Sequence, residues 1–191
     1  MSGNPSTDAA LHLGIAEQGK LLALDGAHDE ALRHYQQALR LAVDAGAPEV
    51  FFRHYTQCVM ESLEALGSYD GVLRFCEDAD HHYQALDKDG PLFALDHGSI
   101  LECLGIIRLK AGDVDAARSA LRRANQLAGP GRLPLAAQVL GWLDRGMTVS
   151  DRHLADAQRR HGYFVVTRER VDPARAIPLP DSLESAPAGL I

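Results

Sequence analysis

A pattern of small residues recurs three times along this 191-residue chain and constrains the fold more than any other feature of the sequence. Each copy begins at a glycine (Gly26, Gly67 or Gly112), followed by an aspartate after three residues, a small or β-branched residue after five and an alanine after twelve. In two copies another glycine, Gly19 or Gly105, stands seven residues before the first. Self-similarity in register is typical of a repeat protein, so we expect one structural unit to recur.

The repeated unit is predicted to be a pair of α-helices. Apolar residues recur at three- and four-residue spacing from Leu11 to Leu143, as in helices that bury one face. Small residues such as Gly19 and Ala38 allow two antiparallel helices to approach closely, and Tyr35 is expected to pack against the next pair. One pair cannot bury its own apolar face, but stacked pairs can. The sequence therefore favours an all-α solenoid.

The repeats resemble those of the tetratricopeptide repeat (TPR) family. The stretch GAHDEALRHYQQALRL at residues 26–41 is similar to the family's strongest half-repeat, and Leu104-Gly105 with residues 111–117 is a second copy. The resemblance covers about residues 11–127, with a spacing longer than the ~34 residues of a standard TPR. Such extended repeats look like those of bacterial regulators and of polarity and motor adaptors. The resemblance implies a right-handed α-solenoid of about three TPR-like helix pairs.

The predicted organisation has four parts: a flexible N-terminus at 1–7, TPR-like repeats at 8–127, capping helices at 128–162, and a β-like segment with an extended tail at 163–191. Pro134 suits the first turn of one capping helix, and Ser150 suits the N-cap of the next. Residues 163–167 are β-like, either pairing with another subunit in a homodimer or covering the last helix. The proline-containing tail is a frayed end, or it docks on a partner or folds back into the groove.

Composition narrows the class of protein. The net charge of −7 repels nucleic-acid phosphates, so we expect no nucleic-acid partner. The three cysteines are odd in number and form no C-x-x-C motif, which favours a reducing compartment. Residues 1–6 lack the basic and apolar regions of a signal peptide, and no apolar run approaches the ~18 residues of a membrane span. We therefore expect a cytoplasmic protein that does not enter membranes.

No motif for catalysis or for cofactor binding appears in the sequence, so we expect neither an enzyme nor a cofactor. Catalytic groups that converge from distant repeats remain an alternative. His54 and Cys58 lie four residues apart and could reach one metal ion, but core cysteines and surface histidines are the favoured interpretation, with no metal. Asp87-Lys-Asp-Gly90 with Asp96 is similar to part of a calcium loop, although Ala85 stands at its first-ligand position.

The TPR resemblance implies a concave face lined by the first helix of each pair. Counted back from the turn glycines, the expected partner-binding residues are Leu13, Lys20, Leu24, His54, Gln57, Glu61, Glu64, Glu102, Ile106 and Lys110. This surface has apolar ends and an acidic middle, which suits an extended segment or a helix with apolar anchors and some positive charge. The family's carboxylate clamp needs several basic residues, and of its positions here only Lys20 is basic.

The sequence thus predicts a protein–protein interaction module that acts as an adaptor, scaffold or assembly factor and binds a peptide or partner helix. Two alternatives belong to other classes. One is a ligand-responsive regulatory subunit, which would act on a separate protein because no DNA-binding domain is evident. The other is an accessory subunit of an enzyme complex, in which the partner holds any metal or cofactor.

Overall fold

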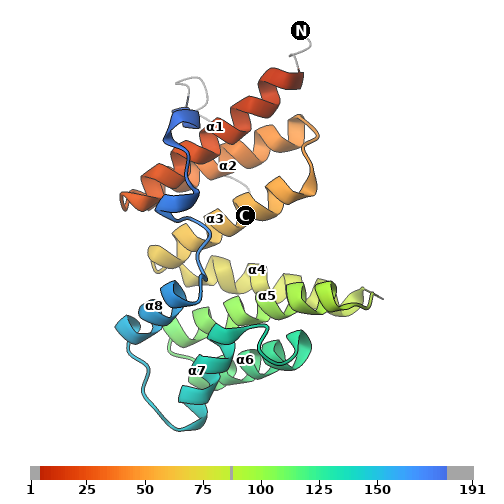
Figure 1. Ribbon diagram of the computed structural model, residues 1–191, viewed down its shortest axis with the longest axis vertical. Coiled ribbons are helices and arrows are strands. Elements are labelled where there is room, and N and C mark those ends of the chain that lie inside the picture. The colour runs from red at the N-terminus through yellow and green to blue at the C-terminus, as the bar shows by residue number, and fades with distance from the viewer. Residues whose placement is uncertain (1–4, 87, 180–191) are drawn as a thin grey trace. The chain divides into compact units, whose positions relative to one another are not determined.

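The computed structural model describes residues 5–86 and 88–179, which form eight α-helices and two short 3₁₀ helices (Figure 1). No strand occurs in these residues, so the predicted all-helical fold is confirmed for them. The chain divides into two compact units. Unit 1 comprises residues 1–68 and 164–191, and unit 2 comprises residues 69–163.

Unit 1 begins with three consecutive helices, α1 (Pro5–Leu24), α2 (His28–Asp44) and α3 (Glu49–Ala65). Helix α1 packs along α2, and α2 packs against α3 (Figure 1). The turn before α2 contains Gly26, whose φ of 84° is the left-handed conformation that glycine adopts without strain. The buried core between the helices includes Ile15 of α1, Ala38 of α2 and Tyr55 of α3.

Unit 2 contains five helices: α4 (Tyr69–Ala85), α5 (Pro91–Lys110), α6 (Val114–Ala128), α7 (Pro134–Asp144) and α8 (Asp151–Arg160). Helices α5 and α6 form a closely packed hairpin, with α4 against α5 and α7 against α6. The predicted helix starts at Pro134 and Ser150 are confirmed. Pro134 lies in the first turn of α7, and the Ser150 side chain accepts the His153 N–H at the start of α8.

The repeated glycine of the sequence corresponds to a repeated close contact. A Cβ on Gly19 of α1 would lie 2.7 Å from the Tyr35 ring of α2, and a Cβ on Gly105 of α5 would lie 2.6 Å from Leu121 of α6. Tyr35 also packs with Cys58 and other residues of α3, as the sequence led us to expect. Glycine is required because only a side chain of one hydrogen leaves room for these two helix pairs.

The middle helix pair of the sequence prediction is divided between the two units, since α3 belongs to unit 1 and α4 to unit 2. The helices at 134–144 and 151–160 lie within the predicted capping region. Helix α1 begins at Pro5, inside the predicted flexible N-terminus. Residues 1–4, Asp87 and the tail after Leu179 lie outside the described residues. Among the helices that are described, none is both long enough and apolar enough to cross a membrane.

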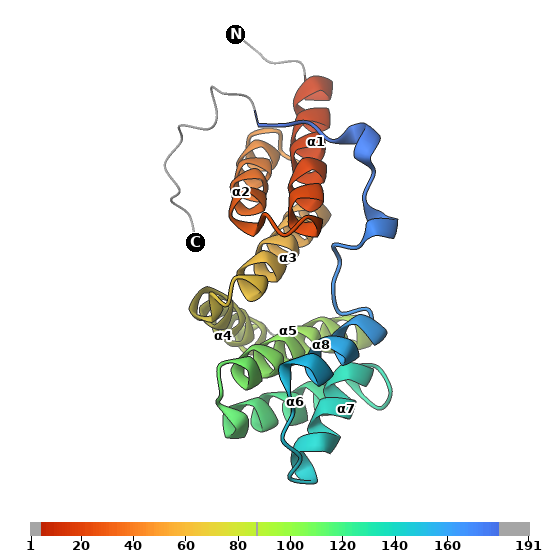
Figure 2. The ribbon, with the colours of Figure 1, turned by 90° about the vertical axis from the view of Figure 1, so that its left-hand side faces the viewer.

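After α8, residues 164–179 belong to unit 1 and run beside α1 (Figures 1 and 2). This segment contains the 3₁₀ helices η1 (Arg168–Arg170) and η2 (Pro173–Arg175) and is otherwise extended. Helix α1 packs directly against η2. The β-like run at residues 163–167 is not part of a strand in the described structure, and the N–H groups of Val165 and Val166 pair with a side chain of α3.

Candidate functional site

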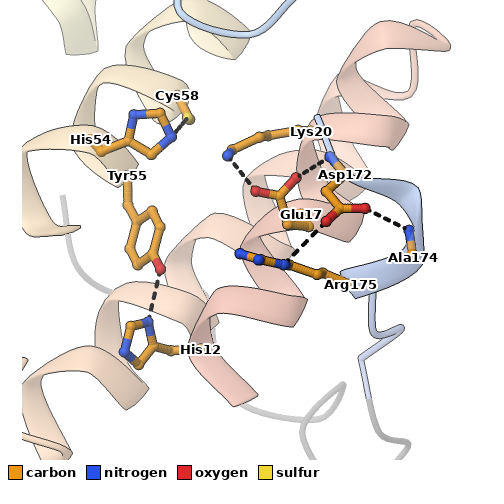
Figure 3. Close-up of polar contacts among 9 residues, drawn as sticks. All are labelled: His12, Glu17, Lys20, His54, Tyr55, Cys58, Asp172, Ala174 and Arg175. Atoms are coloured by element: carbon orange, nitrogen blue, oxygen red, sulfur yellow. Dashed lines mark hydrogen bonds and ion pairs between the residues drawn. The ribbon is translucent and has the colours of Figure 1, made fainter. Parts of the chain in front are cut away.

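Helices α1 and α3 place polar side chains in one region of unit 1. Glu17 and Lys20 lie one turn apart on α1, while His54, Cys58 and Glu61 lie one turn apart in succession on α3 and so share a face. Figure 3 shows the side chains of Glu17, Lys20, His54 and Cys58 in this region. The Lys20 ammonium is buried and lies 2.7 Å from Glu17 Oε1.

The segment 164–179 donates backbone N–H groups to this region. Glu61 Oε1 accepts the Val165 N–H at 2.5 Å, and Glu61 Oε2 accepts the Val166 N–H at 3.1 Å. Glu17 Oε2 accepts the Asp172 N–H at 3.0 Å (Figure 3). The Gly14 carbonyl accepts the Ile177 N–H at 2.9 Å. We call the surface formed by Gly14, Glu17 and Glu61 the α1–α3 face.

Aliphatic side chains of the segment pack beside these hydrogen bonds. Val165 and Val166 pack against a buried cluster made by α2 and α3 that includes Tyr35 and Cys58. Ile177 lies over Gly14, where a Cβ would come within 2.4 Å of the Ile177 side chain. The Leu179 N–H donates to His34 Nε2 of α2 at 3.4 Å, and its side chain packs against the other core cluster of unit 1. The α1–α3 face therefore holds an extended chain by backbone groups and aliphatic side chains together.

Burial sets the electrostatics of Glu61. Desolvation raises the pKa of this carboxyl from 4.5 to about 7, although the hydrogen bonds from Val165 and Val166 favour the charged form and oppose the rise. A carboxylate that accepts two consecutive backbone N–H groups satisfies both with charge-assisted hydrogen bonds. Glu61 thus accepts two consecutive N–H groups of the extended chain, and its charge changes near neutral pH.

The cysteine and histidine of this region are not arranged as a reactive pair. Burial raises the pKa of the Cys58 thiol to about 12, so the thiol stays protonated at neutral pH. His54 Nε2 lies 3.9 Å from Cys58 Sγ (Figure 3), and burial together with Lys20 lowers the pKa of His54. In the described part of the chain, no group of three or more histidine, cysteine or acidic side chains is placed to hold a metal ion.

Two buried tyrosines, Tyr55 and Tyr35, place their hydroxyl groups inside unit 1. The Tyr55 hydroxyl of α3 shares a hydrogen bond of 2.8 Å with His12 Nδ1 of α1 (Figure 3). Burial lowers the pKa of His12, so the neutral imidazole can accept a hydrogen bond from the Tyr55 hydroxyl. The Tyr35 hydroxyl is buried and has no hydrogen-bond partner within the described residues. Burial raises the pKa of Tyr35 above its ordinary value, so the hydroxyl remains neutral beneath the α1–α3 face.

The structure brings three of the expected partner-binding residues, Lys20, His54 and Glu61, into this region of unit 1. Glu64 is buried on α3, where it makes other interactions, and the remaining unit 1 positions are half-buried on α1 and α3: Leu13, Leu24 and Gln57. The sequence prediction omitted Glu17 and Gly14, although folding of the tail back into the groove was one of the alternatives that it left open. The spacing of Glu17 one turn before Lys20 was an available signal for the first of these.

The expected residues of unit 2 all lie on α5. Glu102 of α5 accepts the Ala136 N–H of α7 at 2.8 Å, and burial raises the pKa of this carboxyl. Ile106 is fully buried, so it packs inside unit 2 and not on its surface. Lys110 is half-buried at the end of α5. In both units an inward acidic side chain on one helix therefore accepts backbone N–H groups of a later segment.

A buried ionic network in unit 2 was missed by the sequence analysis. Asp80 of α4 accepts a 2.6 Å hydrogen bond from His97 of α5 and two 2.9 Å hydrogen bonds from the Arg123 guanidinium of α6. Burial alone would raise the pKa of Asp80, but the hydrogen bonds from Arg123 and His97 hold it below its ordinary value. Tyr83 stacks on the His97 ring with the centroids 4.9 Å apart. The network ties three helices together.

Comparison of the chain with protein-family models, with curated proteins and with solved structures finds no match.

Proposed function

We propose that this chain is a protein-interaction module of the TPR-like helical-repeat kind, and that the α1–α3 face of unit 1 binds an extended segment of a protein partner. The observation that carries the proposal is the capture of two consecutive backbone N–H groups, those of Val165 and Val166, by the Glu61 carboxylate. The same face holds further N–H groups of that segment through Glu17 and Gly14.

The proposal follows from the hydrogen-bonding requirements of a helical surface. The N–H groups in the middle of a helix are paired within it, and a helix has no strand edge, so an extended peptide finds few backbone acceptors beyond a carbonyl with a spare lone pair, such as that of Gly14. Such a peptide needs side-chain acceptors for its N–H groups, and Glu17 and Glu61 provide them from two neighbouring helices. Aliphatic contacts with the Tyr35 and Cys58 cluster add apolar burial beside the hydrogen bonds. These are the components of peptide recognition by an acceptor-lined face.

A photo-cross-linking experiment tests the proposal in cells that normally make the protein. A benzophenone amino acid replaces Gln57, which is half-buried on α3, and in a matched control it replaces Ser119, which is exposed on α6. We expect the Gln57 probe to yield a covalent adduct with another protein, mapped to an extended aliphatic segment. Glu61→Gln should reduce its yield. Equal adducts with other proteins from both probes would contradict the proposal.

A further inference from the structure

The segment 164–179 occupies the α1–α3 face although it follows unit 2 in the sequence. It leaves α8 after Arg160, and from Phe164 onward it belongs to unit 1 (Figure 2). The face that is proposed to bind a partner is therefore already covered by a piece of the same chain. A partner segment must either bind elsewhere on unit 1 or take the place of these residues.

The contacts that hold the segment can be copied by another chain. Val165, Val166, Asp172 and Ile177 contribute backbone N–H groups to the face, and these groups exist in every residue except proline. The segment's side chains that pack on unit 1 are aliphatic ones at the Val165, Val166, Ile177 and Leu179 positions. Any extended chain with two adjacent aliphatic residues followed later by another can thus form the same contacts.

The segment is also held at few points. Its residues 168–170 and 172–175 are exposed, and the Ile177 side chain keeps 37% of its surface accessible. Asp172 forms a local ion pair with Arg175 and accepts the Ala174 N–H, so part of η2 depends on the segment itself (Figure 3). Segments with few buried apolar contacts open with low free-energy cost, so exchange with a second chain is physically accessible.

We propose that residues 164–179 are a resident competitor of the α1–α3 face, displaced by a partner segment that has two adjacent aliphatic residues with free backbone N–H groups. This inference rests on the proposed function and names both the partner's chemistry and the regulation of the site. A tethered ligand acts at an effective concentration on the order of mM, so a free peptide binds much more weakly while the resident segment is intact. Loosening the segment therefore strengthens partner binding without any change in the face itself.

The test uses the full chain and a fluorescent synthetic peptide with the sequence of residues 163–179, followed by fluorescence anisotropy. The double variant Val165→Asp with Val166→Asp changes the resident segment and leaves every residue of the α1–α3 face in place, and Ala174→Asp is the control because it adds charge at an exposed position of the same segment. We expect the double variant to bind the peptide at least about tenfold more tightly than wild type or the control. Ile177→Asn, at the other end of the segment, should act in the same direction.

Two further variants locate the binding. Adding Glu61→Gln to the double variant should abolish peptide binding, whereas adding Glu102→Gln, at the matched acceptor of unit 2, should not. A peptide with proline in place of Val166 lacks one captured N–H and should not bind.

Equally tight, Glu61-dependent binding to wild type and to the double variant would overturn the competition but leave the peptide-binding function standing. If neither the double variant nor Ile177→Asn binds the peptide while circular dichroism shows native helicity, both the competition and peptide recognition by this face are overturned.

Discussion

Glu61 combines a buried carboxylate with two backbone donors, and its ionisation is linked to stability. Its pKa is raised to about 7 in the folded chain from an ordinary value of 4.5, so the folded state binds the proton more tightly. Its favourable contribution to the free energy of unfolding is fully present below about pH 4.5 and is lost as the pH rises through about 7. The charged form is therefore the less favourable one for unit 1.

Glu61→Gln should remove this pH dependence, because the amide does not titrate. One pKa unit corresponds to about 1.4 kcal/mol, and partial exposure reduces the effect. We therefore expect the free energy of unfolding of the variant to rise by about 1–2 kcal/mol relative to that of wild type as the pH increases from 4.5 to 7.5. Urea unfolding across this range measures the difference. The control is Glu30→Gln, at an exposed position of α2. A constant difference between wild type and Glu61→Gln would contradict the assignment.

In unit 2 the ionisation of Asp80 is also linked to stability, but its pKa is shifted in the opposite direction to that of Glu61. Its pKa is lowered, so its contribution to stability is present above the ordinary value of 3.8 and is lost as the pH falls through the lower folded value. Asp80→Asn removes the negative charge beside Arg123 and replaces one of the two acceptor oxygens with an NH2 donor, so it should cost about 2–3 kcal/mol at pH 7, less in acid. Urea unfolding measures this cost, with Asp78→Asn at a neighbouring exposed position as control. Equal costs for the two variants would show that the network does not stabilise unit 2.

The burial of Asp80 was predictable from spacing, whereas its partners were not. Val72, Cys76 and Asp80 follow one another at four-residue intervals and are the buried residues of α4, so the aspartate lies on the apolar stripe. A charged residue on such a stripe indicates a buried ionic partner. Which basic residue fills that role depends on the packing of α4, α5 and α6, which no local pattern in the sequence encodes.

At the scale of the helix pair, Gly19 and Gly105 should both be needed for the close approach of their helices. Gly19→Ala and Gly105→Ala place a methyl group 2.7 Å from Tyr35 and 2.6 Å from Leu121, both fully buried. Overpacking should outweigh the helix-propensity gain, with a net loss of about 1–2 kcal/mol for each. Thermal and urea unfolding measure the loss. Gly141→Ala on α7, where the nearest atom is 3.5 Å away, is the matched control and should be neutral or stabilising.

Helices were the most predictable elements, because glycine and proline mark several of their ends. Gly26 lies in the turn before α2, and Pro134 lies in the first turn of α7. The place of residues 164–179 was left open by the sequence, which offered folding of the tail back into the groove only as one alternative to a frayed end or docking on a partner. Val165 and Val166 form a β-like run, yet their N–H groups pair with a side chain and not with a strand. Backbone contacts of this kind leave no side-chain pattern in the sequence of the segment.

At the scale of the whole molecule, the two units should respond differently to loss of the C-terminal segment. A chain that ends at Tyr163 removes the contacts of Val165, Val166 and Ile177 with unit 1. We expect hydrogen exchange in α1, α2 and α3 to accelerate, with unit 1 losing about 2 kcal/mol, while α4–α8 keep their protection. Mass spectrometry of exchanging peptides measures both units in one experiment. Uniform acceleration would indicate that the chain unfolds as one cooperative body.

A chain that ends at Leu179 is the control for this truncation, because it keeps every described contact of the segment. The difference between the two truncated chains isolates residues 164–179.

Unit 1 consists of two stretches of sequence with unit 2 between them, so the ribosome synthesises the helices of unit 1 well before the segment that covers them. Unit 2 is one uninterrupted stretch, so all of its residues have been synthesised by Tyr163. Unit 1 has its three helices early but receives the partners of Glu61 only when Val165 and Val166 have been translated. A nascent chain therefore presents an open α1–α3 face throughout the synthesis of unit 2, and chaperones or a partner emerging nearby meet that face before its own segment does.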